Sequence, residues 1–187
     1  MTGETDWYLD ACALINLYAS GRLAEVAGVL GVRFHVVPKV YPEEAGYILS
    51  PQPDGRRERE RIDLSPMIQR GVVLQTGAPR GAAVAALVRF AAQVDDGEAM
   101  TMAVALTAVP RPAGVVTDDE AALRLLRGEH DASFTTSLSL LRLWSEVAAV
   151  EVPEIRTALH NVEVRGRYRP GPRHPEYAWW LASREVD

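Results

Sequence analysis

The chain has 187 residues and a mass of 20.5 kDa, which fits one sizeable domain with an extension and excludes two large domains. Apolar residues make up 48% of the sequence and charged residues 24%, a balance typical of folded globular proteins and not of disordered or fibrous ones. The formal net charge is −5, so the molecule as a whole does not attract a polyanion. Any contact with nucleic acid must therefore be local.

Cysteine content and apolar stretches bear on the compartment. The single cysteine, Cys12, cannot form an intramolecular disulfide, and the N-terminus lacks the basic start and apolar run of a secretory signal. No charge-free apolar stretch approaches the roughly 20 residues that span a bilayer. We therefore expect a cytoplasmic protein that does not enter membranes. Cys12 lies in a predicted helix with no histidine near it in sequence, so we expect a small buried residue.

Apolar spacing and turn residues predict alternating strands and helices along the first two-thirds of the chain. Strands are expected at 7–10, 32–37, 72–75 and 114–117, and helices at 11–19, 22–30, 40–49, 66–70, 81–94, 98–109 and 119–126. Such alternation predicts the α/β class. We expect a three-layer α/β/α sandwich around a central, mostly parallel sheet that binds ligands at the carboxyl ends of its strands.

Two segments depart from this pattern. Residues 51–64 are polar, contain proline, glycine and mixed charges, and predict an insertion that forms an exposed loop or a hairpin tip. Beyond residue 128, helices are expected at 137–147, 152–161 and 175–184, with a basic, proline-containing stretch at 165–173. We therefore divide the chain into a domain at 1–128 and a C-terminal extension at 129–187, packed on that domain or appended to it.

Acidic residues stand at the junctions between the predicted elements. Asp10 ends the first strand, Glu44 lies early in a helix and Glu98 opens another. The pair Asp118 and Asp119 follows a late strand. In a parallel α/β sheet such positions can converge on one edge, where carboxylates with little cationic compensation suit Mg²⁺ or Mn²⁺. A site of this kind suits hydrolysis of a phosphodiester bond.

Helix capping is an alternative role for each of these residues taken alone. Asp95 and Glu98 have the spacing of a capping box, as do Thr117 and Glu120, and Asp10 could cap the helix that follows it. Acidic residues are also favoured at helix N-termini by the helix dipole. An unrelated α/β domain whose acids are all caps is therefore one interpretation of the sequence.

Four segments taken together resemble the PIN-domain family. They are LDACALINL at 9–17, VYPEEA at 40–45, DDGEA at 95–99 and VVTDD at 115–119, and the resemblance covers about residues 7–126. PIN domains are nucleases with an α/β/α fold that hold Mg²⁺ or Mn²⁺ in a quartet of acidic residues and cleave RNA. Many of them are toxins of bacterial toxin–antitoxin pairs.

The resemblance implies roles for individual residues. Asp10 matches the first acidic ligand of the family, Glu44 the second and Glu98 the third. Asp118 or Asp119 supplies the fourth, and the sequence does not separate the two. The resemblance also implies supporting roles near the metal for Asn16, Asp96 and Thr117.

The same resemblance implies an activity and partners. It implies a metal-dependent endoribonuclease that hydrolyses RNA phosphodiester bonds with Mg²⁺ or Mn²⁺. It also implies a cognate antitoxin protein whose C-terminal segment enters the acidic groove. Homodimers are frequent in the family, and the two apolar helices at 11–30 could supply a surface for one or be covered by the tail. The alternative function is a catalytically inactive PIN-like module that acts by binding protein or RNA.

Arginines suggest where RNA could bind. Arg56, Arg57 and Arg59 of the insertion could contact phosphates, but a mixed-sign run is more typical of a solvated tip, which we favour. In the tail, arginines around Tyr168 could bind phosphates while aromatic rings stack on bases, or the tail could pack on the sheet. The four histidines show no zinc-ligand spacing.

Overall fold

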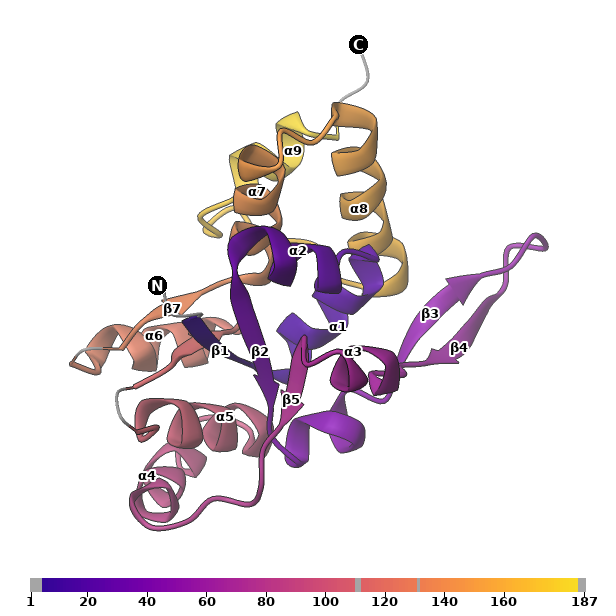
Figure 1. The fold of residues 1–187 in the computed structure, drawn as a ribbon. Helices are drawn as coiled ribbons and strands as arrows, with labels where there is room; N and C mark the ends of the chain where they lie inside the picture. The colour runs from indigo at the N-terminus through magenta and orange to yellow at the C-terminus, as the bar shows by residue number, and fades with distance from the viewer. Residues whose placement is uncertain (1–4, 110–111, 131, 185–187) are drawn as a thin grey trace.

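The main sheet has five strands in this computed structural model, which describes residues 5–109, 112–130 and 132–184 (Figure 1). The strands are β1 (Thr5–Leu9), β2 (Val32–Val36), β5 (Val73–Gln75), β6 (Gly114–Val116) and β7 (Phe134–Thr135). Their order is β5-β2-β1-β6-β7, and each neighbouring pair is parallel. The predicted α/β class with a mostly parallel central sheet is confirmed.

Helices cover both faces of the sheet, which gives three layers (Figure 1). Helices α1 and α2 lie on one face, and α7 and α8 pack against them. Helices α4 and α5 pack together on the other face, where α5 contacts β1 and β6. The helices are α1 (Ala11–Ser20), α2 (Leu23–Leu30), α3 (Ser65–Gln69), α4 (Ala82–Ala91), α5 (Asp96–Leu106), α6 (Glu120–Gly128), α7 (Ser137–Val147), α8 (Val152–Arg165) and α9 (Tyr177–Ala182).

One hydrophobic core joins the sheet to the C-terminal helices. Leu9 and Val116 of the central strands belong to the same buried cluster as Trp144 of α7 and Leu159 of α8. Parallel strands with helices on both faces are buried on both sides, which agrees with their nearly continuous apolar sequences. Residues of the C-terminal extension therefore complete the core of the α/β unit, and the apolar helices α1 and α2 are covered by it. The division of the chain at residue 128 stays a prediction.

Parallel pairing brings the carboxyl ends of the strands to one edge. Leu9 of β1 is in register with Val116 of β6, so Asp10 and Thr117 leave the sheet at the same level. Helix α5 leads back toward the start of β6, so its N-terminus reaches the same edge. Glu44 comes from η1 (Lys39–Glu44), a kinked segment after β2 whose backbone is extended at Tyr41 and which contacts α5.

The largest difference from the predicted elements lies at residues 40–49. The expected helix is replaced by η1 and by strand β3 (Tyr47–Pro51), which pairs antiparallel with β4 (Arg57–Arg61). Pro42 has no N–H to donate inside a helix, and the aromatic and β-branched residues Tyr47 and Ile48 favour a strand. The polar insertion is therefore the outer part of a β-hairpin, which projects from the body of the protein (Figure 1).

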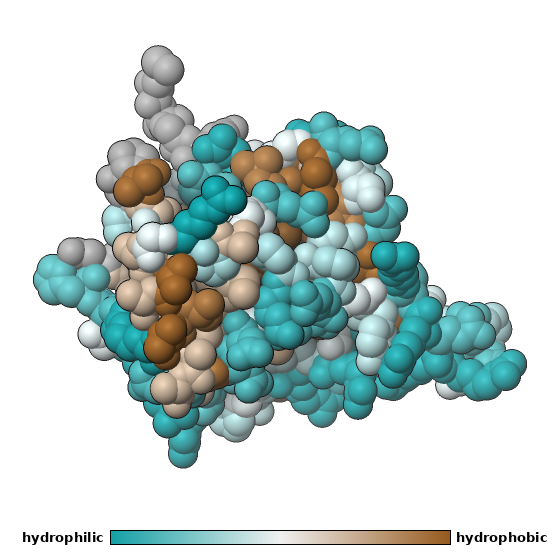
Figure 2. All heavy atoms as spheres, turned by 90° about the horizontal axis from the view of Figure 1, so that it is seen from below, coloured by the Kyte–Doolittle hydropathy of each residue, from teal (hydrophilic) through white to brown (hydrophobic). Residues whose placement is uncertain are grey.

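The face opposite the C-terminal helices carries an apolar strip. Figure 2 shows mostly hydrophilic residues on this face, with apolar residues gathered over α4. Val84 and Val88 of α4 are 47% and 70% exposed. Within the described ranges, no helix combines the length and apolar character that a membrane crossing requires.

Candidate active site

Asp10 follows β1 and is almost completely buried, with 1% of its surface exposed. Its Oδ1 accepts a hydrogen bond from the Ala13 amide at 2.7 Å and caps α1, as the sequence predicts. Oδ2 is also buried, yet it has no hydrogen-bond partner in the described part of the chain. Burial raises the pKa of Asp10 to about 8, against the lowering effect of hydrogen bonds from the Thr117 side chain and the Ala13 amide, and the charges of Asp118 and Glu98 raise it as well. One oxygen of Asp10 therefore caps the helix, and even with the Thr117 side chain beside it the carboxylate keeps lone pairs for a ligand.

Glu44 lies against the first turn of α5. The Gly97 amide donates a hydrogen bond to its carboxylate, and a Cβ added at Gly97 would stand 1.9 Å from Glu44 Oε2. Only glycine leaves room for a carboxylate this close to the helix. Burial raises the pKa of Glu44, which Lys39 lowers and Asp96 raises. Asp96 is the exposed first residue of α5 and acts on Glu44 through its charge.

Glu98 lies between the other candidate ligands. Its Oε2 accepts a hydrogen bond from the Asp95 amide at 3.0 Å, and the capping box predicted for this pair is confirmed. Burial raises the pKa of Glu98, and the charges of Asp119, Asp95 and Glu44 raise it further. The charges of both Asp119 and Glu44 act on Glu98, which therefore lies between them. We call the candidate ligands Asp10, Glu44, Glu98, Asp118 and Asp119 the acidic group.

Asp118 is held on both carboxylate oxygens by protein donors. Its side chain is 1% exposed. Asn16 Nδ2 donates to Oδ2 at 2.9 Å, and the Ser137 amide donates to Oδ1 at 3.0 Å. These bonds tie α1 and the start of α7 to the carboxyl end of β6, and they use one lone pair on each oxygen of Asp118.

Asp119 is the N-cap of α6. Its Oδ1 accepts from the amides of Ala121 and Ala122 at 2.7 and 2.8 Å, so the capping box expected for Thr117 and Glu120 is wrong. Thr117 Oγ1 instead accepts from the Asp119 amide at 3.1 Å. Since the charge of Asp119 acts on Glu98 while both oxygens of Asp118 are bound, the contacts favour Asp119 as the fourth candidate ligand and Asp118 as a support.

Cys12 lies close to several carboxylates of the acidic group, and their charges affect its pKa. The expectation that it is buried is wrong, because the thiol lies exposed in the first turn of α1. Although the residue is exposed overall, partial burial among its neighbours is the main reason that its pKa is raised to about 12, and the charges of four carboxylates, those of Asp10, Asp118, Glu98 and Asp119, add to it. The four charges therefore converge around one point of the surface.

The carboxylates fit a divalent cation only in part. Among residues 5–109, 112–130 and 132–184, no three or more His, Cys, Asp and Glu side chains already form a group that could hold a metal ion. The buried Oδ2 of Asp10 without a donor and the room that Gly97 leaves beside Glu44 nevertheless fit oxygen ligation. The residues therefore fit a Mg²⁺ or Mn²⁺ ion, and a complete set of ligands requires side-chain movement.

The C-terminal segment after α8 brings residues that the sequence did not single out as site residues. His174 Nε2 lies 3.9 Å from Asp118 Oδ1, and the His174 side chain is 7% exposed. A Cβ at Gly166 would stand 2.9 Å from Asn16 Oδ1, so the end of α8 packs closely on the residue that holds Asp118. The only available signal was the basic, aromatic composition of 165–173, which does not show where the segment folds back.

The hairpin arginines make their described contacts within the hairpin and not with the acidic group. Arg57 and Arg59 share one face of β4, because alternate residues of a strand point the same way, and the Arg59 guanidinium lies 4.3 Å from the centre of the Tyr47 ring. Arg56 precedes β4 and its Nε donates to Asp54 Oδ2 at 2.6 Å. No described contact joins these three arginines to the candidate ligands.

Comparisons with protein-family models, with curated proteins and with solved structures found no match. The resemblance to PIN domains therefore stays an expectation based on four sequence segments. The arrangement of the carboxylates is the structural observation on which a function can be argued.

Proposed function

We propose that the protein is a metal-dependent endoribonuclease that hydrolyses RNA phosphodiester bonds. The observation that carries this proposal is Asp10 Oδ2, a buried carboxylate oxygen that no donor of the described residues reaches at full hydrogen-bond geometry, in a group whose charges raise one another's pKa. A buried carboxylate without a partner is costly, and a cation at that place offsets the cost. The choice of RNA as substrate is supported by the sequence resemblance.

Four carboxylates would hold the cation, those of Asp10, Glu44, Glu98 and Asp119. A bound Mg²⁺ or Mn²⁺ lowers the pKa of a water and neutralises charge on the phosphate that is cleaved. Asp10 is placed by its bond to Ala13, and Glu98 by its bond to the Asp95 amide. These bonds hold Asp10 and Glu98 before substrate binds, while Glu44 and Asp119 would move to complete the set of ligands.

Asp118 and Asn16 join the two elements that carry the candidate ligands Asp10 and Asp119. Their 2.9 Å hydrogen bond crosses from the end of β6 to α1, the helix that Asp10 caps. Loss of this bond would change the angle between the two elements that carry Asp10 and Asp119. We therefore assign Asp118, Asn16 and Thr117 as positioning residues.

The partners belong to the same proposal. We expect a cognate antitoxin protein, a cytoplasmic location and a homodimer. Because α1 and α2 are covered by α7 and α8, the exposed valines of α4 are the better surface for a homodimer. Sedimentation of the wild type and of Val88→Glu in separate samples tests this, since only the wild type should form a dimer.

The decisive experiment is cleavage of a pool of structured RNAs by the purified protein. Reactions contain Mg²⁺, Mn²⁺ or EDTA, and they compare the wild type with Asp10→Asn and with Asp63→Asn, which changes an exposed carboxylate away from the group. Cutting that requires metal and is lost only in Asp10→Asn supports the proposal. Equal cutting by wild type and Asp10→Asn would overturn it.

A second function is favoured by one observation, the lack of a ready group of three metal ligands among the described residues. In that case the protein is a catalytically inactive module that binds RNA or protein. A titration with Mn²⁺, followed by its electron paramagnetic resonance signal, separates the two functions. A saturable site at millimolar or lower concentration supports the nuclease, and its absence supports the binding module.

A further inference from the structure

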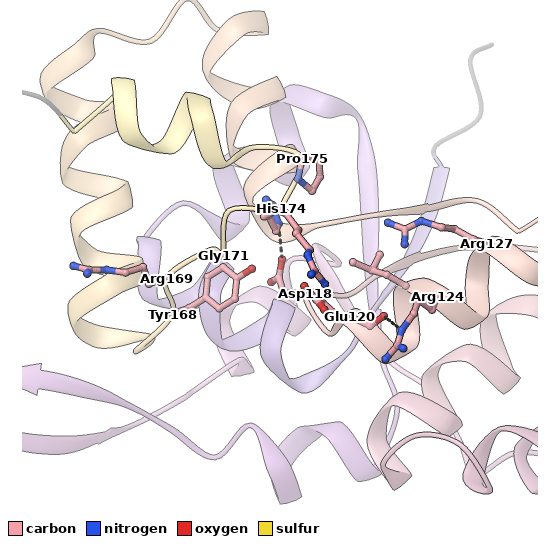
Figure 3. A pocket seen from close by; sticks show the side chains of 11 residues that line it. Asp118, Glu120, Arg124, Arg127, Tyr168, Arg169, Gly171, His174 and Pro175 are labelled. Carbon is pink, nitrogen blue, oxygen red and sulfur yellow. Dashed lines mark hydrogen bonds and ion pairs between the residues drawn. The ribbon is translucent and has the colours of Figure 1, made fainter.

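A cavity of about 310 Å³ opens beside the acidic group, between α6 and the C-terminal segment (Figure 3). Asp118 forms part of its wall and also belongs to the support of the candidate ligands. Leu123 and Arg127 of α6 line one side, and Tyr168 and His174 of the C-terminal segment line the other. The cavity volume lies at the small end of the roughly 300–1,000 Å³ that small-molecule sites occupy. It has room for about one nucleotide and not for a duplex.

The cavity is lined by four arginines and by two carboxylates, those of Asp118 and Glu120, so its lining is cationic on balance. Arg127 and Arg173 line it, and neither has an ion-pair partner within the described ranges. Arg124 also lines it and uses its Nε to bond the Glu120 carbonyl, which leaves its terminal nitrogens available. Arg169 is different, because it pairs with Glu163. Figure 3 shows Arg124 and Arg127 on the α6 side of the cavity, whereas Arg169 points away from it.

His174 supplies an unpartnered donor at the junction between the cavity and the acidic group. Its Nδ1 accepts a hydrogen bond from the Glu176 amide at 3.0 Å, so the neutral imidazole carries its proton on Nε2. Nε2 is buried, has no hydrogen-bond partner among the described residues, and lies 3.9 Å from Asp118 Oδ1, too far for a hydrogen bond. A buried donor without an acceptor points to an absent ligand or water.

Tyr168 provides an aromatic wall. Its ring meets the His174 ring edge-on with the centroids 6.4 Å apart, and its hydroxyl points toward Asp118 in Figure 3. Arg167, the residue before it, has a φ of 59°, a left-handed conformation that is uncommon for a residue with a side chain. This left-handed residue ends α8, because the Tyr168 amide turns back to the Val162 carbonyl, and Tyr168 is the first residue after that turn. A planar ring beside free arginines is the combination that binds single-stranded nucleic acid, by stacking on a base and pairing with a phosphate.

We propose that this cavity binds one nucleotide of a single-stranded RNA, next to the phosphate that is cleaved. Arg124, Arg127 and Arg173 pair with its phosphate, and Tyr168 stacks on its base. This inference rests on the proposed nuclease function, because it places the nucleotide beside the acidic group. It also gives an acidic protein the local positive surface that RNA binding requires.

The test measures binding without cleavage. Fluorescence anisotropy follows a labelled single-stranded RNA of about ten nucleotides in EDTA, with wild type, Arg127→Ala/Arg173→Ala, and the control Arg70→Ala/Arg80→Ala. The control removes the same charge next to β5, at the opposite edge of the sheet from β7. Thermal melting verifies that each variant folds.

We expect the cavity variant to bind at least tenfold more weakly than the wild type and the control to stay within twofold. The slope of log Kd against log salt should fall by roughly one in the cavity variant, since about 0.7 counterion is released per phosphate contact with a single strand. Tyr168→Leu should weaken binding roughly tenfold without changing that slope, while Tyr168→Phe keeps the ring and most of the affinity.

Two results would overturn the inference: no RNA binding by the wild type, or equal loss of affinity in the cavity and control variants. Failure of the nuclease proposal has a different signature. In that case RNA binds through the cavity in EDTA, but no RNA is cut when Mg²⁺ or Mn²⁺ is added.

Discussion

Replacing Asp10 with asparagine should make the metal-free protein more stable, by an amount that grows with pH. Asparagine keeps an oxygen that can accept the hydrogen bond from the Ala13 amide and removes the buried charge. The pKa of Asp10 is raised from 3.8 to about 8, so the folded wild type keeps a proton that the unfolded chain releases above pH 4. Stability from this group is therefore full below the unfolded pKa and is lost as pH rises toward 8.

The size of the effect follows from that shift. One proton held by the folded state alone changes the free energy of unfolding by about 1.4 kcal/mol per pH unit. Between pH 5 and pH 7, the stability of Asp10→Asn relative to wild type should therefore increase by about 3 kcal/mol. Other titrating groups are common to both proteins and largely cancel in the difference.

Urea unfolding in EDTA at several pH values measures this difference. Asp63→Asn is the matched control, because the pKa of that exposed carboxyl is lowered, mainly by its bonds to Ser65, and both states are ionised above pH 5. Its difference from wild type should be constant from pH 5 to pH 8. A constant difference for Asp10→Asn as well would mean that Asp10 is ionised in the metal-free fold, which would refute the reasoning from burial.

Three further outcomes follow from contacts in the site. Gly97→Ala should abolish saturable Mn²⁺ binding, because the new methyl group displaces the Glu44 carboxylate, and it should leave the melting temperature nearly unchanged, because alanine suits a helix. Unchanged Mn²⁺ affinity in a calorimetric titration would contradict this. Asn16→Ala should lower the free energy of unfolding by about 1–3 kcal/mol, because Asp118 Oδ2 loses its donor, and urea denaturation measures it. Cys12 should react with iodoacetamide at pH 8 far more slowly in the folded protein than in urea, since burial and the nearby carboxylates raise its pKa and leave little thiolate. Equal rates would show that its pKa is not raised in the folded protein.

Local signals in the sequence were enough for most of the fold. Strands and helices that alternate along the chain each have their own apolar period, and the capping residues Asp10 and Asp95 mark where helices begin. The expected helix at 40–49 is wrong because its outcome depends on pairing with residues 57–61, a contact that periodicity does not contain. Strand β7 was missed because two residues carry no period.

The candidate site could be predicted only as far as its residues end local elements. Asp10, Glu44 and Glu98 satisfy that condition. Asp118 is distinguished from Asp119 by its hydrogen bond to Asn16, which lies 102 residues away in the chain. No local sequence pattern reports such a contact. The cavity depends on the same kind of long-range packing, because its two sides come from α6 and from the segment after α8.

The alternating charges of β4 disfavour edge-to-edge pairing of this strand with the same strand of a second copy of the chain. Arg57, Arg59 and Arg61 point to one face of the hairpin, and Glu58 and Glu60 point to the other. When two copies of a strand pair antiparallel about a two-fold axis, residues opposite each other come from the same face of the strand. Every such register of β4 with itself sets arginine against arginine and glutamate against glutamate, which is unfavourable. The projecting hairpin is thereby protected from joining its own copy edge to edge, although its outer edge is open to a strand of different charge.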